Sequence, residues 1–424
     1  MNDRRWQQTG KGQYELRDIR YPDSMYTYTK TGGGMQGKAG PFVFGLIIGA
    51  IVAAAVFFGV YRTPNSLSAS AQKKIGRIEK LVDRYYLWDR DDKAEETGVY
   101  KGIISSLGDK YATYYTEEEL RLDRESNAGE FSGIGCTIGS DTEYDMCYIA
   151  GIMEGYGAEK AGLQEGDYFL EVNGEDATNW SSSEVASHVK GPEGTTVNLK
   201  MLRDSEELEF TVERMKVESQ TVAYEMYDEA NKIGYIRIAE FDSITVPQFK
   251  EAKDDLMQQG MKGLILDLRG NPGGLVDACA DIASEMLPKG KIVYALSKDG
   301  QKMQWDSDGR KEIDIPVVIL VNGGTASAAE ILTGAMRDYE KAVVLGTTTF
   351  GKGIIQNTYS LGDGTAVEFT AGEYYLPNGE SIHEKGIEPD IELDIDKEAY
   401  LKDGSDNQLE AAGKEVLKEL GKSN

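Results

Sequence analysis

The spacing of apolar residues changes from one part of the chain to the next. Residues 41–60, PFVFGLIIGAIVAAAVFFGV, are twenty successive residues without a charge, which is long enough to span a bilayer as a helix. Two alternatives stay open: a buried helix of a soluble protein, and a secretory signal peptide cleaved near Ala69–Ala71. The polar flanks and the long lead favour an uncleaved anchor over residues 41–61, after a disordered tail over residues 1–40. Lys and Arg lie on both sides, so their count does not fix the orientation.

Residues 70–120 have the apolar period of helices. In IGRIEKLVDRYYLW, the apolar positions 75, 78, 81, 82 and 85 lie on one helical face. Residues 131–214 then alternate apolar and polar positions in short runs such as YFLEVNG, TVNLKML and LEFTVER, separated by glycine-rich turns. This second pattern predicts a compact β-rich module of about a hundred residues.

From Asn231 onward, apolar runs alternate with amphipathic segments. The expected strands are IGYIRI, GLILDL, VVILVN and KAVVLG, and the expected helices between them are PQFKEAKDDLMQQG, LVDACADIASEML and SAAEILTGAMRD. Strand and helix in turn predict an α/β domain with a largely parallel sheet. We expect IIQNTYSL and AVEFTAGEYYL to close this domain as antiparallel strands, and QLEAAGKEVLKEL to form a terminal amphipathic helix.

Composition narrows the classes of function. The chain has 72 acidic against 46 basic side chains, a net charge of −26, which argues against a nucleic-acid partner. Three cysteines do not make a disulfide framework. Cys136 and Cys147 could face each other on a hairpin, or each could be a small buried hydrophobe. The only histidines are His188 and His383, so a histidine-rich metal site is excluded.

Two strand-to-helix junctions carry candidate chemistry, LDLRGNPGGLVD and ILVNGGTASAAEI. Sites in open α/β sheets form at such junctions. In the second junction Ser327 falls in the first helical turn, and the amide of Ala328 points the same way. In the first, Gly273 and Gly274 leave their amides open as donors for an oxyanion hole. The alternatives are an ordinary N-cap serine and an ordinary turn.

A nucleophilic serine needs a base, and lysine can serve if desolvation lowers its pKa. Lys352 lies in FGKGIIQ, close to apolar Phe350, Ile354 and Ile355 and far in sequence from any carboxylate. In an extended strand, Lys352 and Gln356 would share a face. Gln356 could then hold the amine without adding a charge. A solvated loop lysine is the alternative interpretation.

The segments TASAAEI, FGKGIIQ, LDLRGNPGG and KGIEPD together resemble the carboxyl-terminal processing (tail-specific) peptidases. The resemblance implies a ClpP/crotonase-like α/β catalytic domain with Ser327 as nucleophile, Lys352 as base and Gln356 as its partner. It places the oxyanion donors at the amides of Ala328 and Gly273, and implies no metal or cofactor. The chain departs from the usual motif at Thr325 and Ala329.

The β-rich module resembles the PDZ domain embedded in these enzymes, in FSGIGCTI and AEKAGLQEGDYFLEVNGE. PDZ domains add a peptide end as a strand beside a sheet edge. The carboxylate-binding loop would be Ser132, Gly133, Ile134 and Gly135, and the alternative is a plain hairpin. Cys136 stands where the family usually has an apolar residue. IEKLVDRYYLW and the helix after it resemble the family's amino-terminal helical region, which can mediate a homodimer.

We therefore expect a membrane-anchored serine endopeptidase that cleaves protein substrates, bound through their C-termini, outside the cytoplasm. The expected domains are a helical region (70–120), a PDZ domain (121–214), a peptidase domain (215–395) and a C-terminal helix (396–424). Two alternatives stay open. One is a PDZ protease with a Ser–His–Asp triad, which needs His188 or His383 beside Ser327. The other is a catalytically inactive PDZ adaptor.

Overall fold

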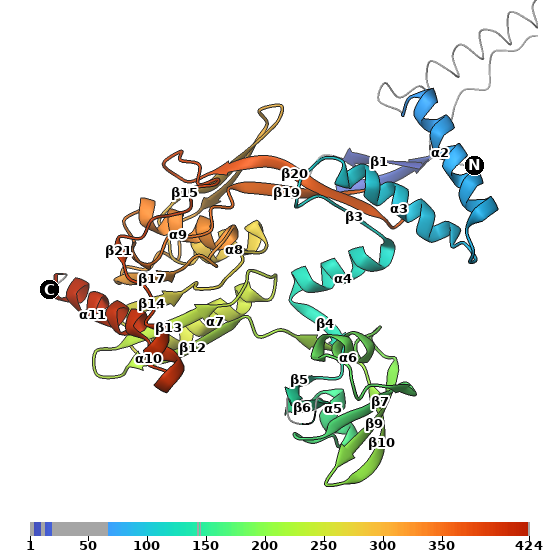
Figure 1. Cartoon of the computed structure of the whole chain (residues 1–424). Coiled ribbons are helices and arrows are strands. Elements are labelled where there is room, and N and C mark those ends of the chain that lie inside the picture. The colour runs from blue at the N-terminus through green and yellow to red at the C-terminus, as the bar shows by residue number, and fades with distance from the viewer. Residues whose placement is uncertain (1–3, 10–12, 19–66, 142–143, 145, 423–424) are drawn as a thin grey trace, which may run out of the picture. The chain divides into compact units, whose positions relative to one another are not determined.

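The computed structural model describes residues 4–9, 13–18, 67–141, 144 and 146–422. The chain divides into two compact units, Met1–Arg90 and Asp91–Asn424 (Figure 1). No helix within the described residues is long and apolar enough to cross a bilayer. The predicted anchor, residues 41–61, lies outside the described part of the chain.

The first unit contains a β-hairpin and one helix. Strands β1 (Arg4–Thr9) and β2 (Gln13–Asp18) pair antiparallel, with Trp6 opposite Leu16. The prediction of a disordered tail over residues 1–40 remains a prediction, because most of that segment lies outside the described residues. The helix is α2 (Ala69–Tyr85), capped by the Ser68 hydroxyl, which accepts the amide of Ala71.

The second unit begins with a mostly helical segment. It comprises α3 (Asp92–Ser105), the short strand β3 (Thr113–Tyr115) and α4 (Glu117–Ala128). Helix α4 has a full capping box, in which the Thr116 hydroxyl and the Glu119 carboxylate each accept the other residue's amide. The predicted helical region is confirmed, with β3 as an addition that the sequence pattern did not indicate.

The β-rich module follows and has its own hydrophobic core. Its main sheet has the order β10-β9-β7-β6-β5, and β4 pairs with β11 beside it. Its elements are β4 (Glu130–Gly133), β5 (Cys136–Asp141), β6 (Met146–Ile152), α5 (Gly157–Ala161), β7 (Tyr168–Val172), β8 (Glu175–Asp176), α6 (Ser182–Val189), β9 (Thr196–Arg203), β10 (Glu206–Glu213) and β11 (Met215–Glu218).

The cysteines of this module are not bonded to each other. Strands β5 and β6 pair in a register that sets Cys136 opposite Ile152 and Cys147 opposite Ser140. Both thiols are free, and both contribute to the core of the module. The structure thus favours the small-hydrophobe interpretation over the hairpin bridge.

The α/β domain is built on a six-stranded sheet of order β12-β13-β14-β17-β18-β21. Within this sheet β12 is antiparallel to its neighbour, and the other five strands run parallel to one another. The strands are β12 (Val222–Asp228), β13 (Ile233–Ile238), β14 (Gly263–Asp267), β17 (Val317–Val321), β18 (Ala342–Gly346) and β21 (Ile391–Glu392). The helices are α7 (Thr245–Gln258), α8 (Val276–Ser284), α9 (Ala328–Asp338), α10 (Lys397–Asp403) and α11 (Asn407–Lys422).

Helices cover both faces of this sheet. The central strands β14 and β17 are therefore buried along their whole length. Helices α7, α8 and α9 belong with the large core on one face, and α11 packs with a separate cluster through Ala412 and Val416. Figure 1 shows α11 and α9 on opposite sides of β14 and β17.

The two late strands are antiparallel, as expected, and they belong to a second sheet. Its order is β16-β15-β20-β19, and β3 joins it at β20. The strands are β15 (Gly290–Ser297), β16 (Lys302–Ser307), β19 (Ile354–Ser360) and β20 (Ala366–Tyr375). Strands β15 and β16 were missed: β15 pairs with β20, and β16 pairs with β15.

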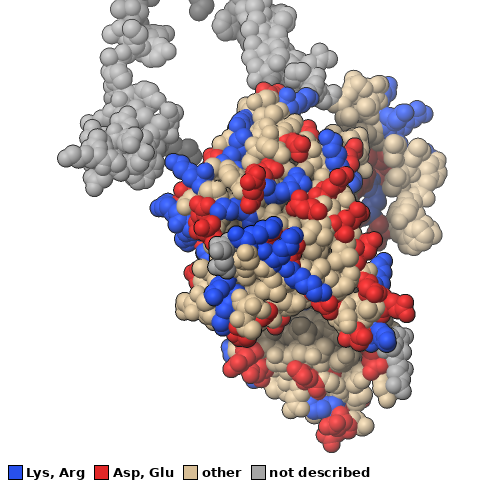
Figure 2. Space-filling view, turned by 90° about the vertical axis from the view of Figure 1, so that its left-hand side faces the viewer, with Lys and Arg blue, Asp and Glu red and all other residues tan. Residues whose placement is uncertain are grey.

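Acidic and basic side chains alternate over the surface that Figure 2 shows. Although the whole chain has a net charge of −26, this face shows no continuous acidic field.

Candidate active site

Ser327 lies between the end of β17 and the start of α9, at the position of the helix N-cap. Its backbone has φ 54° and ψ −119°. N-cap residues normally have β-region dihedrals, and a non-glycine residue at positive φ costs roughly 1–3 kcal/mol. Ser327 therefore has the position of an ordinary N-cap but not its conformation, which is typical of a functional residue that its surroundings hold under strain.

The fully buried carboxylate of Glu330 holds this conformation. Its Oε2 atom accepts the backbone amides of Ser327 and Lys352, both at 2.9 Å. Its Oε1 atom accepts the Thr349 hydroxyl at 2.5 Å and the Gly351 amide at 2.7 Å. A buried carboxylate needs such donors to offset its desolvation. One side chain thus joins the backbone of the serine to that of the lysine loop.

Tyr374 makes a second link between the same two segments. Its side chain is 2% exposed, and its hydroxyl contacts the carbonyl oxygens of Ser327, at 3.2 Å, and of Lys352. Burial raises the pKa of the Tyr374 phenol well above its ordinary value. The group therefore stays protonated and acts as a donor to these carbonyls.

Lys352 precedes β19 in a glycine bracket. Gly351 has φ 87°, and a Cβ on Gly353 would lie 2.6 Å from the backbone nitrogen of His383. The loop can follow this path only because neither neighbour has a side chain. The half-buried Lys352 ammonium lies 4.3 Å from the centroid of the Tyr111 ring.

Burial lowers the pKa of Lys352, as the sequence predicted. The carboxylates of Glu368 and Asp109 act against burial, and the Lys110 ammonium acts with it. The expected neighbour Phe350 is 54% exposed. Neither carboxylate is a close sequence neighbour of Lys352. Strand β20 and the α3–β3 loop bring them near it in the fold, so they could not be identified from the residues around Lys352.

Gln356 lies in β19, and its Nε2 donates to the Thr370 hydroxyl on β20 at 3.1 Å. The predicted reason for a contact between Gln356 and Lys352, a shared face of one strand, does not hold. Lys352 lies before the strand begins, and the register of β19 against β20 shifts between Ile355 and Gln356. Alternation of side chains therefore does not connect the two positions.

A single cavity of about 430 Å³ nevertheless brings the candidates together. Ser327, Lys352, Gln356 and Gly274 all line it. Neither histidine is among the described residues that form its wall. His188 packs on Trp180 in the β-rich module, with ring centroids 4.2 Å apart, so this geometry gives a Ser–His–Asp triad no support.

The NPGG turn meets the serine junction as predicted. Gly273 has φ 106°, and a Cβ there would lie 2.6 Å from the Cβ of Ser327. The Gly273 amide, however, donates to the Asn271 side chain at 2.8 Å. Ala328 is the first residue of α9, where helix amides have no intrahelical acceptor. Of the two expected oxyanion donors, Ala328 is better placed in this conformation.

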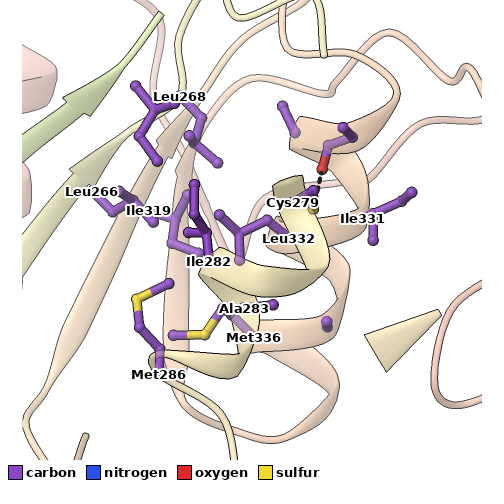
Figure 3. Packing of buried hydrophobic residues seen from close by; sticks show 14 of the residues in the cluster. Leu266, Leu268, Cys279, Ile282, Ala283, Met286, Ile319, Ile331, Leu332 and Met336 are labelled. Atoms are coloured by element: carbon purple, nitrogen blue, oxygen red, sulfur yellow. Dashed lines mark hydrogen bonds between the residues drawn. The ribbon is translucent and has the colours of Figure 1, made fainter. Parts of the chain in front are cut away.

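Helix α9, which starts directly after Ser327, is packed against α8 (Figure 3). Ile282 of α8 and Met286, just beyond the end of that helix, meet Leu332 and Met336 of α9 in the large buried cluster. The Cys279 thiol donates to the carbonyl of Ala328 at 3.1 Å, the contact dashed in Figure 3. This packing fixes the first turn of α9, and with it the direction of the Ala328 amide.

Sequence reasoning missed an ion-pair network below the NPGG turn. Arg269 binds Asp267 and Asp406, and Tyr235 donates to Asp267 at 2.8 Å. The network joins the end of β14 to the start of α11. Its signal was visible as the Asp-x-Arg of LDLRGNPGG, although no local rule identified Asp406 as the partner.

A second cavity, of about 730 Å³, lies beside β4 and α6 of the β-rich module. Ser132 lines it together with Phe131, Ala186 and Lys190. The other three residues of the predicted carboxylate loop are buried and are not part of its wall: Gly133, Ile134 and Gly135.

Comparison with known proteins agrees with the two domains that contain these cavities. Residues 232–393 match the family model described as "Peptidase family S41", and residues 120–202 match that of the PDZ domain. A carboxyl-terminal-processing protease of Synechocystis is 34% identical over 394 residues, covering 87% of this chain and 91% of the relative. The chain belongs to peptidase family S41.

Two further similar proteins are a curated relative and a solved structure. A probable CtpA-like serine protease of Staphylococcus aureus is 34% identical over 359 residues, covering 83% of this chain and 71% of the relative. The solved photosystem II D1 C-terminal processing protease is 29% identical, with a TM-score of 0.46, covering 75% of this chain and 86% of that structure. This S41 chain is accordingly a serine-type, carboxyl-terminal processing peptidase with a PDZ domain.

Proposed function

We propose that the protein is a membrane-anchored serine endopeptidase in which Ser327 is the nucleophile and Lys352 the general base. The observation that carries the proposal is the pair of buried links, through Glu330 and Tyr374, that hold the backbones of these two residues at one cavity. An inactive PDZ adaptor would have no need of a strained serine held in this way.

In the proposed reaction, neutral Lys352 takes the proton of the Ser327 hydroxyl as the serine oxygen bonds to the peptide carbonyl carbon. The amide of Ala328 stabilises the oxyanion, joined by that of Gly273 after it leaves Asn271. Lys352 then returns the proton to the leaving amine, and water releases the acyl group by the reverse steps. Gln356 orients the Lys352 amine. Desolvation favours the neutral form of Lys352 that this sequence requires.

Four variants test the catalytic pair on purified protein, followed by peptide cleavage and fluorophosphonate labelling. Ser327→Ala should lose both activities. Lys352→Arg should lose turnover, since arginine remains charged at working pH, with a loss on the order of 10²–10⁴ in rate or more. His188→Gln and His383→Gln are the controls and should remain active. A folded histidine variant as inactive as Ser327→Ala would overturn the proposed pair.

We further propose that the PDZ domain binds substrate C-termini through the Ser132–Gly135 segment. The cavity beside β4 and α6, whose wall includes Ser132, supports this role. Peptides with a free carboxylate should bind more tightly than their amidated forms, because the amide is uncharged and offers the backbone donors one acceptor oxygen in place of two. Equal affinity for both forms would rule out carboxylate capture.

The proposed location is the cell membrane, with the catalytic body outside the cytoplasm. The uncharged run over residues 41–60 supports an anchor. The full chain should stay in the membrane fraction after carbonate extraction, and protease added to wall-stripped cells should degrade the body. A soluble secreted form that begins near Gln72 would instead show cleavage.

A homodimer through the helical region is part of the proposal. Helix α2 exposes Ile78 (54%), Leu81 (54%) and Tyr85 (70%) on the face that the apolar pattern defines. Sedimentation of the full chain should show a dimer that Leu81→Asp weakens, whereas the polar-face change Glu79→Lys should not. A monomer in both would contradict this part of the proposal.

A further inference from the structure

The aromatic ring that contacts the candidate base comes from outside the α/β domain. Tyr111 lies in the loop between α3 and β3, and its ring centroid is 4.3 Å from Lys352 Nζ. Within the part of the chain that the structure describes, Lys352 Nζ makes no hydrogen bond to Ser327 or Gln356. The lysine side chain thus rests on Tyr111 in this conformation.

Asp109 fixes the loop that presents this ring. Its Oδ1 atom accepts the Tyr111 amide at 3.0 Å, and its Oδ2 atom accepts the Thr370 amide of β20 at 2.9 Å. Backbone pairing of β3 with β20 holds the other side of the loop, with Tyr115 opposite Ala366. The position of Tyr111 is therefore set by the same strand that carries Tyr374.

The ring and the reaction favour opposite charge states of Lys352. An aromatic face attracts an ammonium and has no such attraction for a neutral amine. A general base must be neutral when it accepts a proton. The contact therefore stabilises the form of the lysine that cannot act.

Other charged groups also face this lysine. Glu368 of β20 and Asp109 of the loop favour its charged form, and Lys110 opposes it. Asp123 of α4 lines the same cavity, and Tyr115 donates to it at 3.2 Å. In addition to these groups, the ring of Tyr111 lies directly against the Lys352 ammonium.

We propose that Tyr111 is a positioning residue that holds Lys352 in a charged, resting state, and that Lys352 must leave this ring before it can accept the proton of Ser327. This inference rests on the proposed Ser–Lys pair. It makes the α3–β3 loop a part of the catalytic site, with a role in setting the pH at which the enzyme becomes active.

The experiment compares pH profiles of kcat/KM for peptide cleavage by the full chain. In Tyr111→Leu and Tyr111→Met the ring is absent, so the acid limb should move to lower pH by about half to one unit. Tyr111→Phe keeps an aromatic face and should retain the wild-type limb. Lys110→Gln removes a neighbouring positive charge, so its limb should move in the opposite direction, to higher pH.

The outcomes separate this inference from the proposed function. An unmoved limb in folded Tyr111→Leu or Tyr111→Met, with Lys352→Arg inactive, overturns the role of Tyr111 and leaves the Ser–Lys pair standing. An active Lys352→Arg overturns the pair itself. If Tyr111→Phe moves the limb as far as Tyr111→Leu, the phenol and not the ring is responsible, and the inference is also wrong.

Discussion

The buried carboxylate of Glu330 accepts the backbone amide of Ser327 at 2.9 Å. The serine lies at positive φ, and this bond opposes relaxation of its backbone. Since the same oxygen also accepts the Lys352 amide, the strained nucleophile and the loop of the base are held together by one anion. The predictions below follow from this arrangement and its neighbours.

Glu330→Gln should impair both stability and catalysis. The amide has one acceptor oxygen, and its NH₂ group would face donors that now bind a carboxylate. We expect the free energy of unfolding to fall by about 3 kcal/mol and kcat to fall by more than about 100-fold. Urea unfolding and peptide cleavage measure the two effects, with exposed Glu388→Gln as control. Near wild-type kcat would show that this carboxylate does not organise the site.

Tyr374→Phe should change turnover more than substrate binding. The variant keeps the buried ring and loses only the hydroxyl that contacts the Ser327 and Lys352 carbonyls. Stability should fall by about 1 kcal/mol, and kcat by roughly tenfold, with KM little changed. Tyr375→Phe is the matched control, because its hydroxyl contacts only Glu373 at 3.2 Å among the described residues. A selective rise in KM would contradict the positioning role.

Gly273→Ala should abolish activity for a steric reason. The new Cβ would lie 2.6 Å from the Cβ of Ser327, at a residue with φ 106°. Gly362→Ala is the control for backbone strain alone, because Gly362 has φ 88° and no atom within 4 Å of its added Cβ. We expect about 1–2 kcal/mol of destabilisation in the control with activity kept. Equal activities of the two variants would refute close packing of the NPGG turn on the nucleophile.

Lys352→Met should stabilise the protein at neutral pH. Burial lowers the pKa of Lys352 in the folded state, so the unfolded chain binds more protons between the folded and the ordinary pKa. In that window the stability of the wild type rises with pH. The gain from methionine, on the order of 1 kcal/mol, should therefore be largest below the lowered pKa and shrink as pH rises through it. Thermal unfolding from pH 6 to 10 measures this, and a gain that grows with pH would contradict the sign.

Gly135→Ala should weaken peptide binding by the PDZ domain. Gly135 has φ 76°, and an added Cβ would lie 2.2 Å from the Cβ of Tyr156, so the Ser132–Gly135 segment must shift. Gly155→Ala, at φ 85° with open space around it, is the matched control. Fluorescence anisotropy with a peptide bearing a free carboxylate should show at least a tenfold loss for the first variant only. Unchanged affinity would remove this segment from the binding site.

Local patterns predicted the parallel sheet and the approach of its two glycine-rich turns well. Strands β14 and β17 are uninterrupted apolar runs, which is the pattern of strands buried on both faces. Each feeds a helix through a glycine-rich turn, so the two turns had to meet at one edge of the sheet. This reasoning needs only sequence-local information, and it brought Ser327 beside Gly273.

The surroundings of Lys352 could not be read in the same way. Tyr111 and Asp109 reach it through the pairing of β3 with β20, a contact between segments about 250 residues apart. Glu368 reaches it through the hairpin of β19 and β20. No periodicity encodes such a pairing. The pairing of β15 with β20 in the second sheet is likewise decided by tertiary contacts, and Tyr374 lies in β20.

The pairing of β3 with β20 also bears on when the enzyme becomes active during its synthesis. The site combines a loop that leaves the ribosome early with Tyr374, which leaves it only when nearly the whole chain has been made. A nascent chain that stops short of β20 lacks the hydroxyl beneath Ser327 and Lys352 and the strand that fixes Tyr111. Peptidase activity is therefore acquired late in translation, after the PDZ domain has had its full sequence available for folding.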